Sequence, residues 1–426
     1  MAHYLPEEET LEPEPLRRLQ RARLAKMLDI VLASNPFYRA KLSGIEFDPL
    51  DDPIDKLPFT TRAEIERDQR EHPPYGANLT FPLDQYVRLH QTSGSGGTPL
   101  RCLDTAENWQ WWMRCWRIIY AAANVAKDDR LFFPFSFGPF IGFWGAFEAA
   151  AELGCLRLAA GGMTTSARLR YLLDNGVTFI CCTPTYALRM AEVASQEGFD
   201  IASSPVRGLL IAGEPGGGIP ATRKRIETAW GARVYDHAGL TELGPWGFES
   251  HEAPNGLHVL ETEFIAEVID PDSGGIIDDE RPGELVMTNL GRIGCPLIRY
   301  RTGDQVCLTR GRCIAGRWFA WAERGVIGRI DDMIHIRGNN VFPAAIEGIL
   351  REFEDVAEFR IAVEQRDALA DLAIEIEPAA GKDSNALVEN VTNALRDRLH
   401  FRSRVRAVEP GSLPRFEMKA RRVVRM

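Results

Sequence analysis

The stretch that decides the fold consists of RYRTGDQVCL at residues 299–308 and GRIDDMIHIRGNNVFP at residues 328–343. We expect Asp304 to lie in a tight Thr-Gly-Asp turn after a strand, while Arg329 opens the second block. An aspartate that accepts hydrogen bonds and an arginine that donates them can together hold a ribose diol. The acidic pair beginning at Asp331 marks a charged joint between two halves of the protein, because such residues resist burial.

A loop rich in glycine and hydroxyl residues lies far upstream, at Thr92-Ser93-Gly94-Ser95-Gly96-Gly97-Thr98-Pro99. Backbone N–H and side-chain O–H groups of such a loop can converge on phosphate oxygens. It lacks the Gly-Lys-Ser/Thr ending of a Walker loop and the third glycine of the dinucleotide fingerprint. A flexible surface loop is the alternative. The strand-like run at 87–91 and the helix-like stretch after Thr105 predict that the loop connects a strand to a helix, as phosphate loops usually do.

Two further blocks follow. The first is Tyr235-Asp236-His237-Ala238-Gly239-Leu240-Thr241-Glu242, in which Thr241 and Glu242 could hold a phosphate oxygen and a magnesium ion. The second is Pro414-Arg415-Phe416-Glu417-Met418-Lys419, near the last residue. A lysine in a basic tail is usually solvated surface, so Lys419 gains meaning only beside the other blocks.

The four blocks, in this order and at these spacings, resemble the adenylate-forming superfamily of acyl- and aryl-CoA synthetases, above all its phenylacetate–CoA ligase branch. The resemblance extends from SNPFYRAKL (34–42) and LPFTTRAEI (57–65) to KARRVVRM (419–426). It implies an ATP-dependent, AMP-forming ligase that converts a carboxylic acid into acyl-AMP and passes the acyl group to coenzyme A, with Mg²⁺ as cofactor. The acid is expected to be aromatic or otherwise compact and apolar.

The resemblance also implies a role for each block. Lys419 would bridge the substrate carboxylate and the α-phosphate, Glu242 would bind Mg²⁺, and Thr241 would contact the α-phosphate. Asp331 would be the hinge between the domains. The loop at Gly338, Asn339 and Asn340 would approach the pantetheine of CoA. The residues expected to hold ATP and AMP are Thr92, Ser93, Gly94, Ser95, Gly96, Gly97, Thr98, Glu214, Asp236, His237, Ala238, Thr241, Asp304 and Arg329.

Three positions depart from the family pattern. Thr98 stands where the loop usually has a lysine, which removes a cation from the pyrophosphate. Ala238 stands where many relatives stack a tyrosine on adenine, and His237 or Tyr235 could supply that surface instead. Met418 replaces the glycine that usually precedes the final lysine.

A structural zinc site found in some relatives is reduced here. The matching stretches are FESHEAPNGLHV (248–259) and GRCIAGRW (311–318), where His258 and Cys313 remain. Ser250 and Ala315 occupy the positions of cysteines, so only half of a tetrahedral set is left. His251 could add a third ligand, but we expect no structural zinc.

The acyl pocket is expected within LFFPFSFGPFIGFWGAFEAA, residues 131–150. Its expected lining is Phe137, Phe140, Phe143, Trp144 and Gly145, with a second wall from Ala212, Gly213 and the neighbouring Glu214. Phe143 and Trp144 replace smaller residues of relatives, which predicts a shallower pocket. Core packing is the alternative for each aromatic. Residues 131–150 contain no lysine or arginine, so a second carboxylate on the substrate is disfavoured.

Composition agrees with this interpretation. The 426 residues include 60 acidic and 50 basic side chains, a net charge of −10, which argues against nucleic acid or an anionic membrane as the main partner. The eight cysteines show no disulfide spacing, as expected in a reducing compartment. The acidic N-terminus is unlike a signal peptide, and no apolar run is long enough to span a bilayer. We expect a cytoplasmic enzyme that acts on small molecules, and a homodimer is left open.

The order of segments predicts an α/β fold. Helix-like and strand-like segments alternate from 106 to 236, which indicates a mostly parallel sheet flanked by helices. Residues 257–310 alternate with a shorter period, typical of antiparallel strands or a small distorted β-barrel-like part. We expect a large N-terminal domain over 1–330 that binds ATP and the acyl substrate, and a small mobile α+β C-terminal domain over 331–426 that carries the catalytic lysine.

Two rival hypotheses remain. The chain could adenylate an acid and pass the acyl group to a carrier protein or an amine. It could also be a non-catalytic nucleotide-binding homologue, which the departures at Thr98, Ala238 and Met418 would favour.

Overall fold

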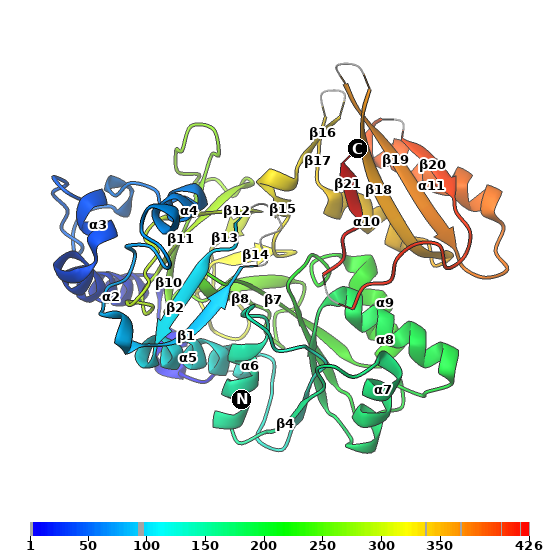
Figure 1. The fold of residues 1–426 in the computed structure, drawn as a ribbon, viewed down its shortest axis with the longest axis horizontal. Coiled ribbons are helices and arrows are strands. Elements are labelled where there is room, and N and C mark those ends of the chain that lie inside the picture. The colour runs from blue at the N-terminus through cyan, green and yellow to red at the C-terminus, as the bar shows by residue number, and fades with distance from the viewer. Residues whose placement is uncertain are drawn as a thin grey trace.

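The computed structural model describes residues 3–92, 98–336, 339–366, 369–401, 403–417 and 419–425. Figure 1 shows a large N-terminal part and a smaller C-terminal part, the latter coloured orange to red. The smaller part has its own hydrophobic core and its own sheet. This arrangement confirms the predicted α/β fold with a separate small C-terminal α/β domain.

The N-terminal segment is helical. Its helices are α1 (Pro6–Glu9), α2 (Pro13–Ser34), α3 (Pro36–Lys41) and α4 (Arg62–Glu71), with short 3₁₀ turns η1 (Ile54–Lys56) and η2 (Leu83–Gln85). A proline at the first helical position starts α2, where the missing N–H costs nothing. A capping box between Thr61 and Glu64 starts α4 and so fixes the position of Arg62, its first residue.

A nine-stranded sheet forms the centre of the large part, in the order β13-β14-β9-β8-β7-β6-β5-β3-β4. The strands β3 to β7 run parallel, as predicted. Parallel sheets are covered on both faces, which agrees with fully buried apolar runs such as Phe179–Cys182. The parallel strands and their helices are β3 (Arg130–Phe133), α6 (Trp144–Glu152), β4 (Leu156–Ala159), α7 (Thr165–Asp174), β5 (Phe179–Cys182), α8 (Pro184–Glu197), β6 (Gly208–Ala212), α9 (Pro220–Trp230) and β7 (Arg233–Leu240). The antiparallel remainder is β8 (Gly244–Phe248), β9 (Gly256–Val259), β13 (Leu308–Thr309) and β14 (Trp321–Glu323).

The phosphate loop connects two strands. β1 (Tyr86–Gln91) pairs antiparallel with β2 (Arg101–Thr105), and α5 (Ala106–Ala122) begins only after β2. The predicted strand at 87–91 and the predicted helix after Thr105 are confirmed, but the strand β2 lies between the loop and that helix, which was not predicted. The five residues of β2 are too few for their alternation to stand out before a helix.

A second sheet is antiparallel, in the order β10-β11-β12-β15, as the alternation after residue 257 predicted. Its strands are β10 (Phe264–Ile269), β11 (Gly283–Asn289), β12 (Tyr300–Val306) and β15 (Gly328–Arg329). The Thr-Gly-Asp sequence lies inside β12 and not in a turn, which corrects the prediction. Gly303 has a φ of 74° where the pairing register shifts, so a bulge aims Asp304.

The C-terminal part follows the predicted β-α-β-β-α-β order, with two added strands. Its elements are η3 (Ile330–Asp332), β16 (Ile334–Ile336), β17 (Asn339–Val341), α10 (Pro343–Glu352), β18 (Val356–Arg366), β19 (Leu369–Pro378), α11 (Ser384–Leu399), β20 (Arg404–Ala407) and β21 (Val423–Arg425). The last strand returns beside β18, as Figure 1 shows in red. The segment before β21 therefore passes between the C-terminal part and the large part.

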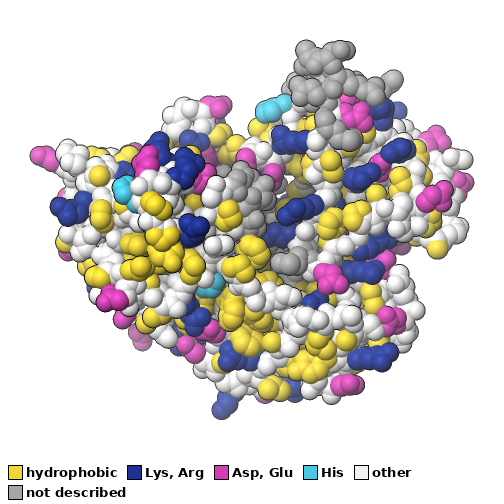
Figure 2. All heavy atoms as spheres, in the orientation of Figure 1, with side chains coloured by type: hydrophobic (Ala, Val, Ile, Leu, Met, Phe, Trp, Pro, Cys, Tyr) yellow, Lys and Arg dark blue, Asp and Glu magenta, His cyan; other side chains and the backbone are white. Residues whose placement is uncertain are grey.

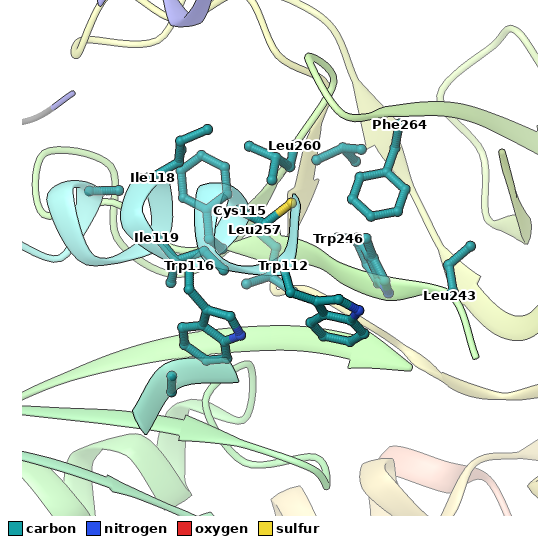
Figure 3. Packing of buried hydrophobic residues seen from close by; sticks show 14 of the residues in the cluster. Trp112, Cys115, Trp116, Ile118, Ile119, Leu243, Trp246, Leu257, Leu260 and Phe264 are labelled. Atoms are coloured by element: carbon teal, nitrogen blue, oxygen red, sulfur yellow. The ribbon is translucent and has the colours of Figure 1, made fainter. Parts of the chain in front are cut away.

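Helix α5 forms the centre of the main hydrophobic core. Figure 3 shows Trp112 and Trp116 projecting from this helix to the same side. The spacing of four residues places them one turn apart. Gly145 at the start of α6 lets that helix approach, because a Cβ there would lie 2.6 Å from Nε1 of Trp116.

Candidate active site

Asp304 and Arg329 face each other on paired strands, β12 and β15. Nη1 of Arg329 lies 3.2 Å from Oδ1 of Asp304, and its Nε donates a 2.9 Å hydrogen bond to Asp331. Burial raises the pKa of Asp304 to about 6, although the positive charge of Arg329 acts in the opposite direction. Asp304 and Arg329, which the sequence analysis assigned to the same task, thus form an ion pair. Arg329 also contacts Asp331, the expected hinge residue.

Thr241 and Glu242 lie between β7 and β8, and the side chain of Arg292 binds their backbone. This guanidinium donates 2.8 Å hydrogen bonds to the carbonyl oxygens of both Thr241 and Glu242. It also forms a two-point ion pair with Asp104, at 2.7 and 2.8 Å, and both side chains are completely buried. The sequence analysis missed Arg292 and Asp104, because no local motif marks residues that meet across 188 positions of sequence.

Glu242 presents its carboxylate to the site. The hydroxyl of Tyr300 donates a 2.9 Å hydrogen bond to Oε1 of Glu242, and Nη1 of Arg62 lies 3.9 Å from the same oxygen. The second carboxylate oxygen has no hydrogen bond among the described residues. Mg²⁺ commonly binds through one or two carboxylates together with substrate phosphates and water. The donor set at Glu242 therefore fits the ion that the family implies.

Arg62 also reaches the phosphate loop. Its Nη2 donates hydrogen bonds to Oγ1 of Thr92 at 3.3 Å and to the carbonyl oxygen of Thr98 at 3.5 Å. The predicted contacts Ser93, Gly94, Ser95, Gly96 and Gly97 lie outside the described residues. Both described ends of the loop are thus joined to a cation that the sequence analysis missed. The nearby signal was the Thr-Thr-Arg sequence and its capping box.

Lys419 lies against the loop after β6. A Cβ on Gly213 would come within 3.2 Å of Cε of Lys419. The next amide, Ala420 N–H, donates a 2.7 Å hydrogen bond to Glu214, whose other oxygen accepts one of 2.9 Å from Thr185 N–H. Burial raises the pKa of Glu214.

Charged residues from several of the sequence blocks lie around the amine of Lys419. Loss of hydration lowers the pKa of Lys419, and Arg329 lowers it further, whereas Glu214, Asp304 and Glu242 act to raise it. Lys419 is an exposed residue, and its amine lies near enough to these groups for their charges to shift its pKa. Residues from the loops after β6 and β7, from β12 and β15, and from the C-terminal segment therefore meet at one place.

Tyr235 and His237, which the sequence analysis offered as the surface for adenine, are both largely buried. Tyr235 is only 2% exposed, and its hydroxyl lies 2.7 Å from Nδ1 of His251. His237 is 7% exposed and packs against Trp116, with ring centroids 4.6 Å apart. Both rings are buried on the core side of β7, so their burial argues against either of them stacking on adenine.

Asp236 lies on the same strand, under the loop that follows β6. It would collide with a Cβ on Gly217, at 2.3 Å, and its Oδ1 accepts a 3.1 Å hydrogen bond from His237 N–H. Burial raises the pKa of Asp236 to about 7, and the negative charge of Glu249 raises it further. Because Asp236 lies so close to the backbone of Gly217, it can shape the loop that follows β6.

Most of the aromatic residues of 131–150 pack against one another. Phe137 lies 4.7 Å from Trp144 and 4.8 Å from Phe147 between ring centroids. Phe140 is 37% exposed, whereas Phe143 is 4% exposed and lies in the main core beside Trp116. Phe143 therefore packs as core, which is the alternative that the sequence left open, while Phe137 and Trp144 remain partly accessible.

The stretches that match the zinc site hold a different arrangement. His258 is completely buried, and neither ring nitrogen has a hydrogen-bond partner among the described residues. Burial and the charge of Arg317 lower its pKa to about 3. Arg317 itself forms a buried ion pair with Glu9, with Nε 3.1 Å from Oε2. Across the described ranges, no three His, Cys, Asp or Glu side chains come close enough to hold a metal ion.

The expected hinge and CoA loop lie at the start of the C-terminal part. Asp331 is exposed in η3, and its carbonyl oxygen accepts a 3.4 Å hydrogen bond from Arg425. Asn339 and Asn340 belong to β17, which pairs with β16. Gly338 and Met418 lie outside the described residues, as do the side chains of the two asparagines.

Polar contacts join the two parts. Figure 2 shows basic and acidic side chains gathered along the hollow between them. Arginines provide several of these contacts. They are Arg168 to Glu417 at 3.4 Å, Arg225 to the carbonyl oxygen of Val356 at 3.3 Å, Arg415 to Glu192 at 3.4 Å and Arg422 to Thr185 at 3.2 Å.

Family comparisons match nearly the whole chain. A family model described as AMP-binding enzyme matches residues 40–291, and one described as AMP-binding enzyme C-terminal domain matches residues 338–425. Phenylacetate-coenzyme A ligase of Thermus thermophilus is 31% identical over 449 residues, covering 99% of each chain. The protein of the same name from Escherichia coli is 31% identical over 432 residues, covering 97% of this chain and 96% of its own.

Solved structures of a 2-hydroxyisobutyryl-CoA ligase are similar at 26% identity. In its postadenylation state with R3-HIB-AMP, that ligase gives a TM-score of 0.94, covering 100% of this chain and 93% of its own. In its thioesterification state with 2-HIB-AMP and CoA, it gives a TM-score of 0.75, covering 100% and 92%. Among the described helices, none combines the length and apolar character needed to cross a membrane.

Proposed function

This chain belongs to the family of AMP-binding enzymes, in the branch of the phenylacetate-coenzyme A ligases, and on that premise we propose a role for each residue of the site. It is an ATP-dependent, AMP-forming acid–CoA ligase that uses Mg²⁺ and coenzyme A. The residue roles below, the domain boundary at 330/331 and the substrate class form the proposal.

One observation carries the proposal: Lys419 lies against Gly213 while its amine shares one electrostatic environment with Glu214, Asp304 and Glu242. A carboxylate is a poor electrophile and must first become a mixed anhydride with AMP. A cation placed between the acid and the α-phosphate stabilises charge as the carboxylate attacks. Lys419 would supply this cation.

The remaining nucleotide contacts follow from the same geometry. Asp304, with Arg329 beside it, would accept hydrogen bonds from the ribose hydroxyls. Thr241, fixed by Arg292, would contact the α-phosphate. Glu242 would hold Mg²⁺, which supplies Lewis-acid stabilisation to the phosphates. The phosphate loop over 92–98 would enclose the β- and γ-phosphates.

Arg62 would supply the cation that Thr98 does not. Its guanidinium already contacts both ends of the described loop and lies near Glu242. A guanidinium is well suited to two phosphate oxygens at once. The departure at Thr98 therefore does not favour a non-catalytic homologue.

Transfer to CoA would require a second arrangement of the small domain. The similarity to the postadenylation state, higher than that to the thioesterification state, supports the view that the present arrangement serves adenylation. Rotation at Asp331 would withdraw Lys419 and bring the loop at 338–340 to the acyl group. A boundary at 330/331 would put Arg329 and its ion-pair partner Asp331 on opposite sides of this joint.

The acid would be compact. Phe137, Trp144, Ala212 and Gly213 would line its site, with Phe140 at the edge. Measured with a panel of aryl and short-chain acids, pyrophosphate release that depends on the acid, followed by thioester formation with CoA, would support the proposal. A carrier protein and an amine run in parallel test the other acceptors. Nucleotide binding without acid-dependent pyrophosphate release would overturn it.

A further inference from the structure

His237 occupies the strand beside the expected acyl site, and its orientation follows from β-sheet geometry. It is the register partner of Ala212 on the parallel neighbour β6, so both side chains lie on one face of the sheet. That face packs against α5, where Trp116 contacts the imidazole ring. Trp116 in turn lies against Gly145. His237 thus belongs with three residues that line or adjoin the expected acyl site.

The hydrogen bonding of His237 identifies the tautomer. Nδ1 lies 2.7 Å from the carbonyl oxygen of Gly247, which can only accept, so Nδ1 carries the proton. Burial lowers the pKa of His237 to about 4, so the ring is neutral at physiological pH. Nε2 therefore presents a lone pair and acts as a hydrogen-bond acceptor.

Nε2 makes no hydrogen bond among the described residues, and the residue as a whole is 7% exposed. Trp116 lies against the ring, and a Cβ on Gly239 would come within 3.4 Å of Nε2. As an acceptor without a partner, Nε2 can receive a hydrogen bond from a ligand that donates one.

We propose that His237 selects acids whose acyl group carries a hydrogen-bond donor, a hydroxyl or an amino group, over the same acids without it. The inference rests on the proposed function, because it takes the face shared by Ala212, Gly145 and Trp116 as the acyl site. His237 is a specificity residue here and takes no part in bond making. The absence of lysine and arginine from 131–150 agrees with a neutral donor on the substrate.

The experiment compares matched acids: hydroxyphenylacetic with phenylacetic acid, hydroxy- and aminobenzoic with benzoic acid, and 2-hydroxyisobutyric with isobutyric acid. Methoxy analogues control for size, because they keep the oxygen but lack the donor. Acid-dependent pyrophosphate release gives kcat/KM for each. We expect the wild type to favour at least one donor acid by roughly 10- to 100-fold over its partner and over the methoxy analogue.

Two variants assign that preference to Nε2. His237→Leu should reduce the ratio to near one, and His237→Gln, whose amide oxygen can reach the Nε2 position, should keep part of it. His72→Gln, on the exposed histidine that caps the C-terminal end of α4, is the matched control and should leave the ratio unchanged. The affinity for ATP should be the same in all four proteins.

The outcomes separate the two proposals. Acid-dependent pyrophosphate release with equal kcat/KM for every matched pair would overturn the role of His237 and leave the proposed function intact. Complete absence of acid-dependent release in the wild type would overturn the proposed function itself. Should His237→Leu fail to fold, the ratio in His237→Gln and the methoxy comparison in the wild type still decide, because a purely structural histidine would give no donor preference.

Discussion

The amide of Ala420 donates a 2.7 Å hydrogen bond to Glu214, so the residue after the proposed catalytic lysine is tied to the large domain. The second oxygen of Glu214 accepts from the first turn of α8. A single buried carboxylate thereby orients the segment that delivers Lys419.

Replacement of Lys419 by alanine should separate the two half-reactions. We expect adenylation to fall by ~10²-fold or more, because the cation that stabilises the developing charge is lost. Thioester formation from pre-formed acyl-AMP should be largely retained. Pyrophosphate release and thioester mass measure the two steps separately, and an equal loss of both would contradict the role of Lys419.

Arg62 offers a test of phosphate binding. Arg62→Ala should raise the KM for ATP by roughly 10- to 100-fold, since charge-assisted hydrogen bonds to charged groups contribute about 1.5–3 kcal/mol. Arg62→Lys should recover part of this loss by restoring the charge without the fork. Lys56→Ala, on an exposed lysine outside the site, is the control. An unchanged KM in Arg62→Ala would show that another group replaces the loop lysine.

Asp331→Pro should hold the chain in the adenylating arrangement, because proline fixes φ and so blocks rotation at the hinge. Pyrophosphate release should survive while thioester formation collapses. Asp332→Pro, one residue further along η3, is the neighbouring comparison. Thioester output at the wild-type level in Asp331→Pro would place the hinge elsewhere.

Nucleotide affinity should depend on pH through Asp304. Its pKa is raised to about 6, so the carboxylate that we propose as the acceptor of ribose hydrogen bonds is mostly protonated below that pH. AMP binding, measured by calorimetry, should strengthen as pH rises through about 6 and level off about one pH unit above it. Asp304→Asn should bind weakly at every pH, without this step.

The same shift has the opposite effect on stability. The folded protein holds a proton on Asp304 that the unfolded chain, with the ordinary value of 3.8, has already released. The contribution of Asp304 to the free energy of unfolding should therefore decrease as pH rises from about 4 to about 6. Denaturant unfolding of the wild type and Asp304→Asn across this range measures it.

Purified protein should contain no stoichiometric zinc. Ser250 and Ala315 cannot provide thiolates, and His258 with Cys313 is half of a tetrahedral set. Metal analysis after dialysis against a chelator tests this directly. Close to one zinc per chain, lost in His258→Ala, would contradict it.

The sequence predicted those parts of the site that are local in sequence. Asp304 and Arg329 occupy short motifs, and their strands pair as neighbours. Arg62 and Arg292 were missed because they act through contacts with distant segments, and a single sequence does not show such contacts. The orientation of the His237 side chain could not be predicted from the sequence either, because it depends on how α5 packs onto β7. Sequence alternation alone does not indicate which face that helix covers.

The contacts between the two parts are hydrogen bonds and ion pairs, and some of them, such as the ion pair of Arg415 with Glu192, are partly exposed to water that can replace them. Individual surface pairs of this kind are worth about 0–1 kcal/mol. The free-energy difference between the two arrangements is then small enough for differential binding of successive ligands to reverse it. In such an enzyme the bound ligand determines which half-reaction takes place. Rotation of the small domain then needs no separate energy source.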